Sequence, residues 1–277
     1  MTFPRTARST TRAGGTMNPP FTKQETYIKE FSSIDYYNTY YAPGKGVLFG
    51  EWTDFVLKNL HETFTSGNVK GDILIDFGAG PTIYHLLSAC EVFNNIITSD
   101  FLEQNRIQLE KWLRKDPDAL DWTHVVKCVC ELESNSDNWE KKEATLRRKV
   151  TKVLKCDALV EKPYYPVAMP EADCLISCLC LEAPCKDLEA FTNTLKNFKA
   201  LLKTGGHIVI QSVLKCTFYF VGNKWFSCLY LTKDDLEKAF YEAGYDIVSV
   251  KVTPRSDKSG MDISDYDSFY FVHARKP

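Results

Sequence analysis

The segment from residue 71 to residue 84, GDILIDFGAGPTIY, constrains the fold more than any other part of the chain. A short apolar run at residues 73–77 leads through two glycines into residues 83–93, whose apolar spacing is typical of a helix. Gly78 and Gly80 allow the backbone to approach a ligand closely, and Pro81 suits the first position of a helix. The segment therefore predicts a strand, a glycine turn and a helix, with a ligand at the carboxyl end of the strand.

Strand and helix patterns go on alternating along the chain. Apolar runs predict strands in 95–100, 153–160, 172–181, 207–214, 246–252 and 268–274. Helical periodicity predicts helices over 51–64, 103–115, 137–154, 187–203 and 232–244, and a hairpin turning at Gly222 lies before the last of them. We expect Asp137 and Glu140 to cap the third helix and Gly205-Gly206 to stop the fourth. The pattern predicts one α/β domain with a Rossmann-like, seven-stranded, mostly parallel sheet, helices on both faces and an antiparallel last strand.

Composition excludes several classes of protein. Hydrophobic residues make up 44% and charged residues 25%, which excludes a mainly disordered chain. A formal net charge of −2 without a basic stripe argues against nucleic-acid binding. The longest nearly apolar stretch, 174–181, is too short to cross a bilayer, so no membrane association is expected.

The 10 cysteines favour a reducing compartment. They form no CxxC pair and no disulfide framework, and the histidines are not near them, so we expect free thiols, no metal site and a cytosolic protein. Residues 1–16 contain three arginines and no acid. We interpret them as a disordered tail or as a segment before a true start at Met17, since Pro4 and two glycines argue against a helical presequence. Residues 17–277 form the predicted domain.

Charges around the glycine turn indicate which ligand it holds. Acids follow the predicted strands at Asp76, Asp100 and Asp157, and Asp100 has the place of the carboxylate that binds ribose hydroxyls in nucleotide-binding sheets. The turn lacks a phosphate-binding Lys-Ser/Thr, and Ile83 replaces the third glycine of the dinucleotide motif. An acidic site suits a cationic nucleoside without phosphate, such as S-adenosylmethionine, and the five tyrosines in 27–41 could face its charge. Asp76 could instead be a strand-end residue satisfied by backbone amides.

Several segments together resemble one family, the small-molecule N-methyltransferases that act on nicotinamide, indolethylamines and phenylethanolamine. They include FTKQETY, IDYYNTYY, GDILIDFGAGPTIYHLLSACE, LEKWLRKDPDALDW, VLKCD and LLKTGGHIVI, and the similarity spans about residues 17–276. The resemblance implies a class I S-adenosylmethionine-dependent enzyme with an N-terminal lid, a small amine or pyridine as substrate and a monomeric state. Gly78 and Gly80 are expected at the cofactor in any case, and the resemblance assigns further cofactor contacts to Tyr36, Tyr41, Thr82, Tyr84, Asp100, Asn105, Asp157, Ala158 and Cys178.

The resemblance also implies an acceptor site, and here the chain departs from its relatives. Glu182 matches an acidic residue that faces the amine in phenylethanolamine-type enzymes, whereas the nicotinamide enzyme has Asp there, and we expect Glu182 to be catalytic. Ser212 replaces an Asp of the nicotinamide enzyme, and Cys216 and Cys228 replace serines. Tyr36, Leu179 and Tyr219 complete the predicted acceptor site. An apolar pocket favours an indolethylamine-like substrate, and the alternatives are a pyridine acceptor, a non-catalytic cofactor-binding relative or an NAD-dependent oxidoreductase.

Overall fold

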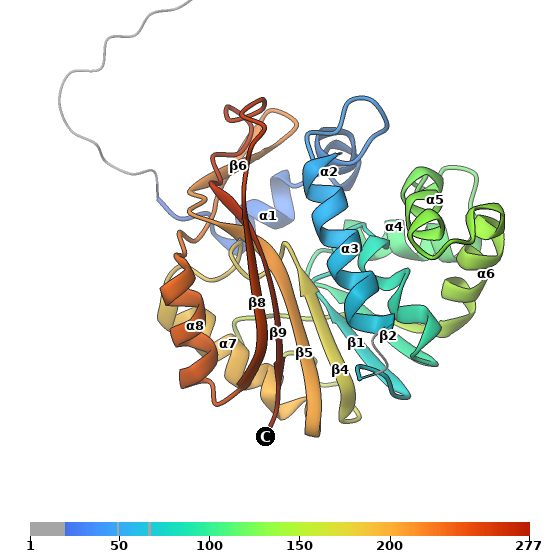
Figure 1. The fold of residues 1–277 in the computed structure, drawn as a ribbon. Coiled ribbons are helices and arrows are strands. Elements are labelled where there is room, and N and C mark those ends of the chain that lie inside the picture. Colours follow the sequence, from blue (N-terminus) through green and yellow to red (C-terminus); the bar gives the residue numbers. More distant parts are fainter. Residues whose placement is uncertain (1–19, 49, 66–67) are drawn as a thin grey trace, which may run out of the picture.

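The computed structural model of the chain describes residues 20–48, 50–65 and 68–277. The interpretation of residues 1–16 therefore lies outside the described residues. Seven strands form one sheet in the order β3-β2-β1-β4-β5-β9-β8 (Figure 1). Their bounds are β1 Ile73–Phe77, β2 Asn95–Asp100, β3 Val150–Lys155, β4 Ala172–Cys178, β5 Leu202–Leu214, β8 Asp246–Pro254 and β9 Ser268–Arg275.

The pairing of the strands confirms the predicted topology. β1 pairs in parallel with β2 and β4, and β2–β3 and β4–β5 are also parallel. β9 is antiparallel to both of its neighbours and lies between β5 and β8. The chain moves outward through β2 and β3 and then returns to the other side of β1 with β4, which makes the carboxyl ends of β1 and β4 the switch point where such sheets bind ligands.

Helices cover both faces of the sheet. On one face the core contains side chains of α3 (Glu51–Thr65), α4 (Glu103–Arg114), α5 (Thr123–Leu132) and α6 (Trp139–Lys149). On the other face it contains those of α7 (Leu188–Ala200) and α8 (Lys233–Glu242). Neighbouring residues Leu74 and Ile75 of β1 belong to opposite cores, as the alternation of side chains along a strand requires. Within the described ranges, no helix has the length and apolar character needed to cross a bilayer.

The predicted helix over residues 83–93 is wrong. This stretch forms two single turns of 3₁₀-helix, Tyr84–Leu86 and Ala89–Glu91. All residues from 81 to 90 are buried, including the polar His85 and Ser88. A surface helix needs one exposed face, so the helical spacing of apolar residues here reflects burial on all sides.

Two predicted helix boundaries are also wrong. The helix expected over 137–154 begins at Trp139 without a side-chain cap and ends at Lys149, and residues 150–155 form β3 beside β2. Val150 and Val153 therefore belong to a strand, which suits their branched side chains. Gly205 and Gly206 lie within β5, because α7 already ends at Ala200. The predicted start of α8 is confirmed, since Thr232 and Asp235 form a reciprocal capping box.

A roof of N-terminal helices and a hairpin lies beyond the carboxyl ends of the strands (Figure 1). It consists of α1 (Gln24–Glu30), α2 (Ser33–Tyr40) and the predicted hairpin, β6 (Phe218–Val221) with β7 (Lys224–Ser227). Thr22 and Ser227 exchange two hydrogen bonds of 2.6 and 2.8 Å, and the Tyr40 hydroxyl donates to the Phe220 carbonyl at 2.7 Å. These bonds hold segments 180 to 205 residues apart in the sequence over one edge of the sheet.

Candidate active site

A cavity of about 710 Å³ lies between the roof and the carboxyl ends of the strands. Its size is within the range of small-molecule sites, about 300–1,000 Å³. Gly78, Gly80 and every residue that the family resemblance assigns to the cofactor and acceptor sites line it, namely Tyr36, Tyr41, Gly78, Gly80, Thr82, Tyr84, Asp100, Asn105, Asp157, Ala158, Cys178, Leu179, Glu182, Ser212, Cys216, Tyr219 and Cys228. The structure thus brings together residues from widely separated parts of the chain.

The glycine turn after β1 forms part of the cavity wall. Gly78 and Gly80 have φ angles of 70° and 61°, which other residues adopt only with strain. A Cβ atom on Gly78 would lie 2.0 Å from the Cys180 sulfur, whereas one on Gly80 would meet nothing closer than 3.9 Å. The turn therefore packs tightly against the end of β4 at Gly78 and leaves space beside Gly80.

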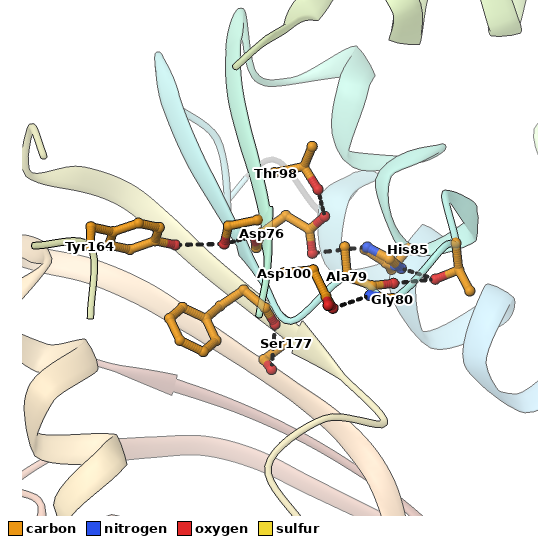
Figure 2. A network of polar contacts seen from close by, with 11 residues as sticks. Asp76, Ala79, Gly80, His85, Thr98, Asp100, Tyr164 and Ser177 are labelled. Carbon is orange, nitrogen blue, oxygen red and sulfur yellow. Dashed lines mark hydrogen bonds and ion pairs between the residues drawn. The ribbon is translucent and has the colours of Figure 1, made fainter. Parts of the chain in front are cut away.

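Asp76 does not line the cavity, contrary to the prediction. Its carboxylate is fully buried beneath the turn, where the Thr98 hydroxyl donates to Oδ2 at 2.6 Å and His85 Nε2 lies 2.9 Å from Oδ1 (Figure 2). The alternative interpretation, in which Asp76 is a structural residue at the end of the strand, describes its position better. That interpretation expected backbone amides as partners, whereas the structure has the side chains of Thr98 and His85. Asp76 thus connects the strand, its neighbour β2 and the 3₁₀ turn that replaces the predicted helix.

Asp100 at the end of β2 organises the cofactor side of the cavity (Figure 2). Its Oδ2 accepts a hydrogen bond from the Gly80 amide at 2.8 Å, and its Oδ1 accepts from the Leu102 amide at 2.8 Å and from Asn105 Nδ2 at 3.0 Å. Burial raises the pKa of Asp100, and these hydrogen bonds oppose that shift. A carboxylate has about four acceptor positions, and these three hydrogen bonds leave one position, on Oδ2, for a ligand hydroxyl. The sequence predicts contacts with both ribose hydroxyls, so the structure leaves room for one of the two.

We expect the substitution Asp100→Ala to weaken S-adenosylmethionine binding about ten- to a hundredfold, because it removes a buried charged acceptor and releases the Gly80 amide. Isothermal titration calorimetry measures the change. Asp118→Ala is the control, because Asp118 is an exposed residue after α4 that pairs with Lys111 and does not line the cavity, so its loss should leave the affinity unchanged. Equal affinity in Asp100→Ala and the wild type would contradict a ribose-binding role.

Three tyrosines lie beside the glycine turn. The hydroxyls of Tyr36 and Tyr41 are 3.4 Å apart, and the rings of Tyr41 and Tyr84 stack with centroids 5.8 Å apart. Burial raises the pKa of Tyr36 to about 12 and raises the pKa values of Tyr41 and Tyr84 well above the usual value, so all three are neutral. Their faces can attract a cation. The Thr82 hydroxyl is already committed, donating to the Ala79 carbonyl at 2.7 Å.

Asp157 connects the sheet to the roof. Both of its carboxylate oxygens accept from Gln24 Nε2, at 3.1 and 3.2 Å, and Oδ1 also accepts from the Leu159 amide. A second such bond joins α2 to α4, where the Ser33 hydroxyl donates to Asn105 Oδ1 at 2.6 Å. Helices α1 and α2 are therefore fastened to the residues predicted to contact the nucleoside. Gln24 was not predicted as a site residue.

The acceptor side of the cavity is formed by the ends of β4 and β5. Leu179 follows β4 with a φ of 49°, an uncommon value for a bulky residue and of the kind found at functional sites. Glu182 is 3% exposed, and its Oε1 accepts a hydrogen bond from the Tyr270 hydroxyl. Burial raises the pKa of Glu182, and hydrogen bonds from Tyr270 and Ser212 oppose the rise. A buried carboxylate thus faces the cavity.

Around Glu182 the polar groups are largely paired with one another. The Cys216 thiol donates to the Phe218 carbonyl at 3.2 Å and lies 3.6 Å from the Ser264 hydroxyl. The Tyr219 hydroxyl is 3.0 Å from that of Tyr27 in the roof. This wall offers few groups for a carboxamide. In the described part of the chain, no three His, Cys, Asp or Glu side chains converge to hold a metal ion.

The sheet order, the antiparallel β9 and the cavity over β1 and β4 define the fold class of class I S-adenosylmethionine-dependent methyltransferases. Solved structures agree on the fold. The 1,6-didemethyltoxoflavin-N1-methyltransferase of Burkholderia thailandensis matches 94% of this chain and 93% of its own with a TM-score of 0.52 and 14% identity. A methyltransferase from Methanosarcina mazei matches 75% and 93% with a TM-score of 0.52 and 11% identity.

The chain belongs to the NNMT/PNMT/TEMT family, whose profile matches residues 19–277. The indolethylamine N-methyltransferase of Oryctolagus cuniculus is 45% identical, over 87% of this chain and 92% of its own length. The nicotinamide N-methyltransferase of Homo sapiens is 43% identical, over 94% and 98%. The phenylethanolamine N-methyltransferase of Macaca mulatta is 34% identical, over 90% and 89%. The resemblance stated from the sequence is confirmed.

Proposed function

We propose that the chain transfers a methyl group from S-adenosylmethionine to the nitrogen of a small aryl-alkyl amine of the indolethylamine type. Family and fold establish the N-methyltransferase class and the cofactor. The identity of the methyl acceptor is what we propose here. The observation that carries the proposal is the buried Glu182 carboxylate, which lines a part of the cavity whose other polar groups are largely paired with one another. A cytosolic location and a monomeric state remain predictions.

The cavity fits the cofactor. Space beside Gly80, the remaining acceptor position of Asp100 and the tyrosine faces suit a nucleoside that carries a sulfonium and an ammonium group. When bound, the cofactor supplies an electrophilic methyl group. The protein's task is then alignment, which can lower a barrier by roughly 7–11 kcal/mol in favourable cases.

Glu182 supplies what an amine acceptor needs. An alkylamine with a pKa near that of lysine, ~10, arrives protonated at neutral pH and has no free lone pair. The Glu182 carboxylate can bind the ammonium and accept its proton, and the freed lone pair then forms the nitrogen–carbon bond as the carbon–sulfur bond breaks. A pyridine nitrogen is already unprotonated at pH 7, so it needs neither a carboxylate to bind an ammonium nor a base to accept a proton. The carboxylate therefore favours an amine over a nicotinamide-like acceptor, although nicotinamide enzymes are among the relatives.

A panel of acceptors tests this proposal. The protein is incubated with radiolabelled S-adenosylmethionine and, separately, with tryptamine, phenylethanolamine, nicotinamide and a simple thioether, and products are identified by mass spectrometry. We expect methylated tryptamine to dominate. Faster methylation of nicotinamide would replace the amine by the pyridine alternative, and cofactor binding without any product would favour a non-catalytic relative.

A further inference from the structure

Behind the wall of the cavity, β9 contributes a hydroxyl group that none of the sequence motifs indicated. Tyr270 is fully buried and lies opposite Ser212 in the antiparallel pairing of β5 with β9. It is not among the cavity-lining residues, yet its hydroxyl donates to Glu182 Oε1. The only polar atom of this side chain is therefore directed at the acid of the acceptor site.

We infer that Tyr270 is a positioning residue of the acceptor site, whose hydroxyl fixes the Glu182 carboxylate as the anion that meets the acceptor nitrogen. The inference rests on the proposed function, because it assigns a partner to the carboxylate that carries that proposal. It adds a residue that does not touch the substrate and acts through another side chain.

The geometry supports this role in two ways. A carboxylate bonded through one oxygen can no longer turn freely, so Glu182 presents its second oxygen in a fixed direction. Ser212 lies directly opposite Tyr270 in the strand pair and also lowers the pKa of the same carboxyl. The hydroxyl that bonds Glu182 comes from a strand of the sheet, and a rigid strand positions a partner more precisely than a loop does.

The electrostatics act in the same sense. Burial and the adjacent carboxylate raise the pKa of Tyr270 well above its usual value, so it remains a proton donor at every working pH. Donation to the charged form of Glu182 lowers the pKa of that carboxyl against the effect of burial. The titratable groups whose pKa the Glu182 charge raises are Tyr270 and the thiols of Cys178, Cys180, Cys185 and Cys228. All of these thiols have a raised pKa and are neutral, so hydrogen bonds rather than cations stabilise the anion.

The substitution Tyr270→Phe removes only the hydroxyl. We expect kcat/KM for tryptamine to fall roughly ten- to a hundredfold, as the loss of a hydrogen bond to a buried charge implies. Because the pKa of Glu182 rises in the variant, the acidic limb of the pH profile of kcat/KM should move to higher pH. Affinity for S-adenosylmethionine, measured by calorimetry, should stay the same.

Tyr245→Phe is the matched control. Tyr245 is also a buried tyrosine of the same core, but its hydroxyl donates to the Leu195 carbonyl of α7, and neither residue lines the cavity. This variant should show a comparable loss in thermal unfolding temperature without any shift of the pH profile. A shift in both variants would mean that the effect of Tyr270→Phe is merely structural.

A double-mutant cycle with Glu182→Gln distinguishes failure of the inference from failure of the proposed function. If Tyr270 acts through Glu182, then Tyr270→Phe should cause no further loss of kcat/KM in the Glu182→Gln background. If the losses of kcat/KM in the two single variants multiply in full in the double variant, the inference is overturned while the function of Glu182 stands. An unchanged kcat/KM in Tyr270→Phe would have the same meaning. If Glu182→Gln itself retains full activity on tryptamine, the proposed function fails, and the inference fails with it.

Discussion

Replacing Glu182 by Gln should reduce kcat for tryptamine by roughly 10²–10⁴-fold, the usual contribution of a positioned general base. The amide has the shape of the acid and can still be bonded by Tyr270, but it neither attracts an ammonium nor takes its proton. Affinity for S-adenosylmethionine should change little, because the cofactor side of the cavity is organised by Asp100 and the glycine turn. Steady-state kinetics and calorimetry on the same preparation measure both quantities.

The pH dependence provides a second measurement. Burial raises the pKa of Glu182, so protonation removes the anion at a higher pH than for an exposed glutamate. In the wild type, kcat/KM for an amine should therefore fall as the pH is lowered through this pKa. The Glu182→Gln enzyme lacks the group and should lose this acidic limb.

A control variant separates the function of Glu182 from the general cost of altering a buried acid. Glu143→Gln changes a buried glutamate that is ion-paired with Arg147 on α6, away from the cavity. It should lower stability without lowering turnover. If Glu182→Gln weakens cofactor binding as much as it lowers turnover, then Glu182 is a structural residue and the assignment is wrong.

Most of the strands were predictable because their signal is local. β1 and β4 are largely apolar, as expected for strands buried on both faces, and the sheet followed from their alternation with helices. The start of β3 was missed, because residues 150–154 continue the helical spacing of α6. The residues around the cavity were predictable for a similar reason. Many of them lie at or just after the end of a strand, and the carboxyl ends of parallel strands meet at one edge of the sheet.

What the sequence could not show depends on long-range contacts. Residues 83–93 have helical periodicity, but they form two short 3₁₀ turns, and residues 81–90 are all buried. Asp76 is an acid beside the glycine turn, yet Thr98 and His85 hold it beneath the surface of the cavity. Tyr270 lies in an apolar strand, and nothing near it in the sequence indicates that its hydroxyl meets Glu182. Each of these outcomes is set by tertiary packing, which local patterns do not record.

The same long-range packing predicts a large effect at Gly78, because the glycine turn has no room for a side chain there. In Gly78→Ala the new Cβ would lie 2.0 Å from the Cys180 sulfur and 2.9 Å from its Cβ, so rotating the thiol alone cannot relieve the contact. The φ of 70° adds strain of about 1–2 kcal/mol, and overpacking adds about 1–3 kcal/mol.

The free energy of unfolding should accordingly fall by roughly 2–5 kcal/mol, which lowers the unfolding temperature by about 5–15 °C in a domain of this size. Thermal unfolding followed by circular dichroism measures this, and calorimetry should show weaker S-adenosylmethionine binding, since the turn shifts away from β4. Gly80→Ala is the matched control, with a φ of 61° but no atom within 3.9 Å of the added Cβ. It should bear only the backbone strain, about 1–2 kcal/mol. If the two variants unfold at the same temperature, the close approach of the turn to Cys180 contributes nothing, and glycine is needed at both positions for its backbone conformation alone.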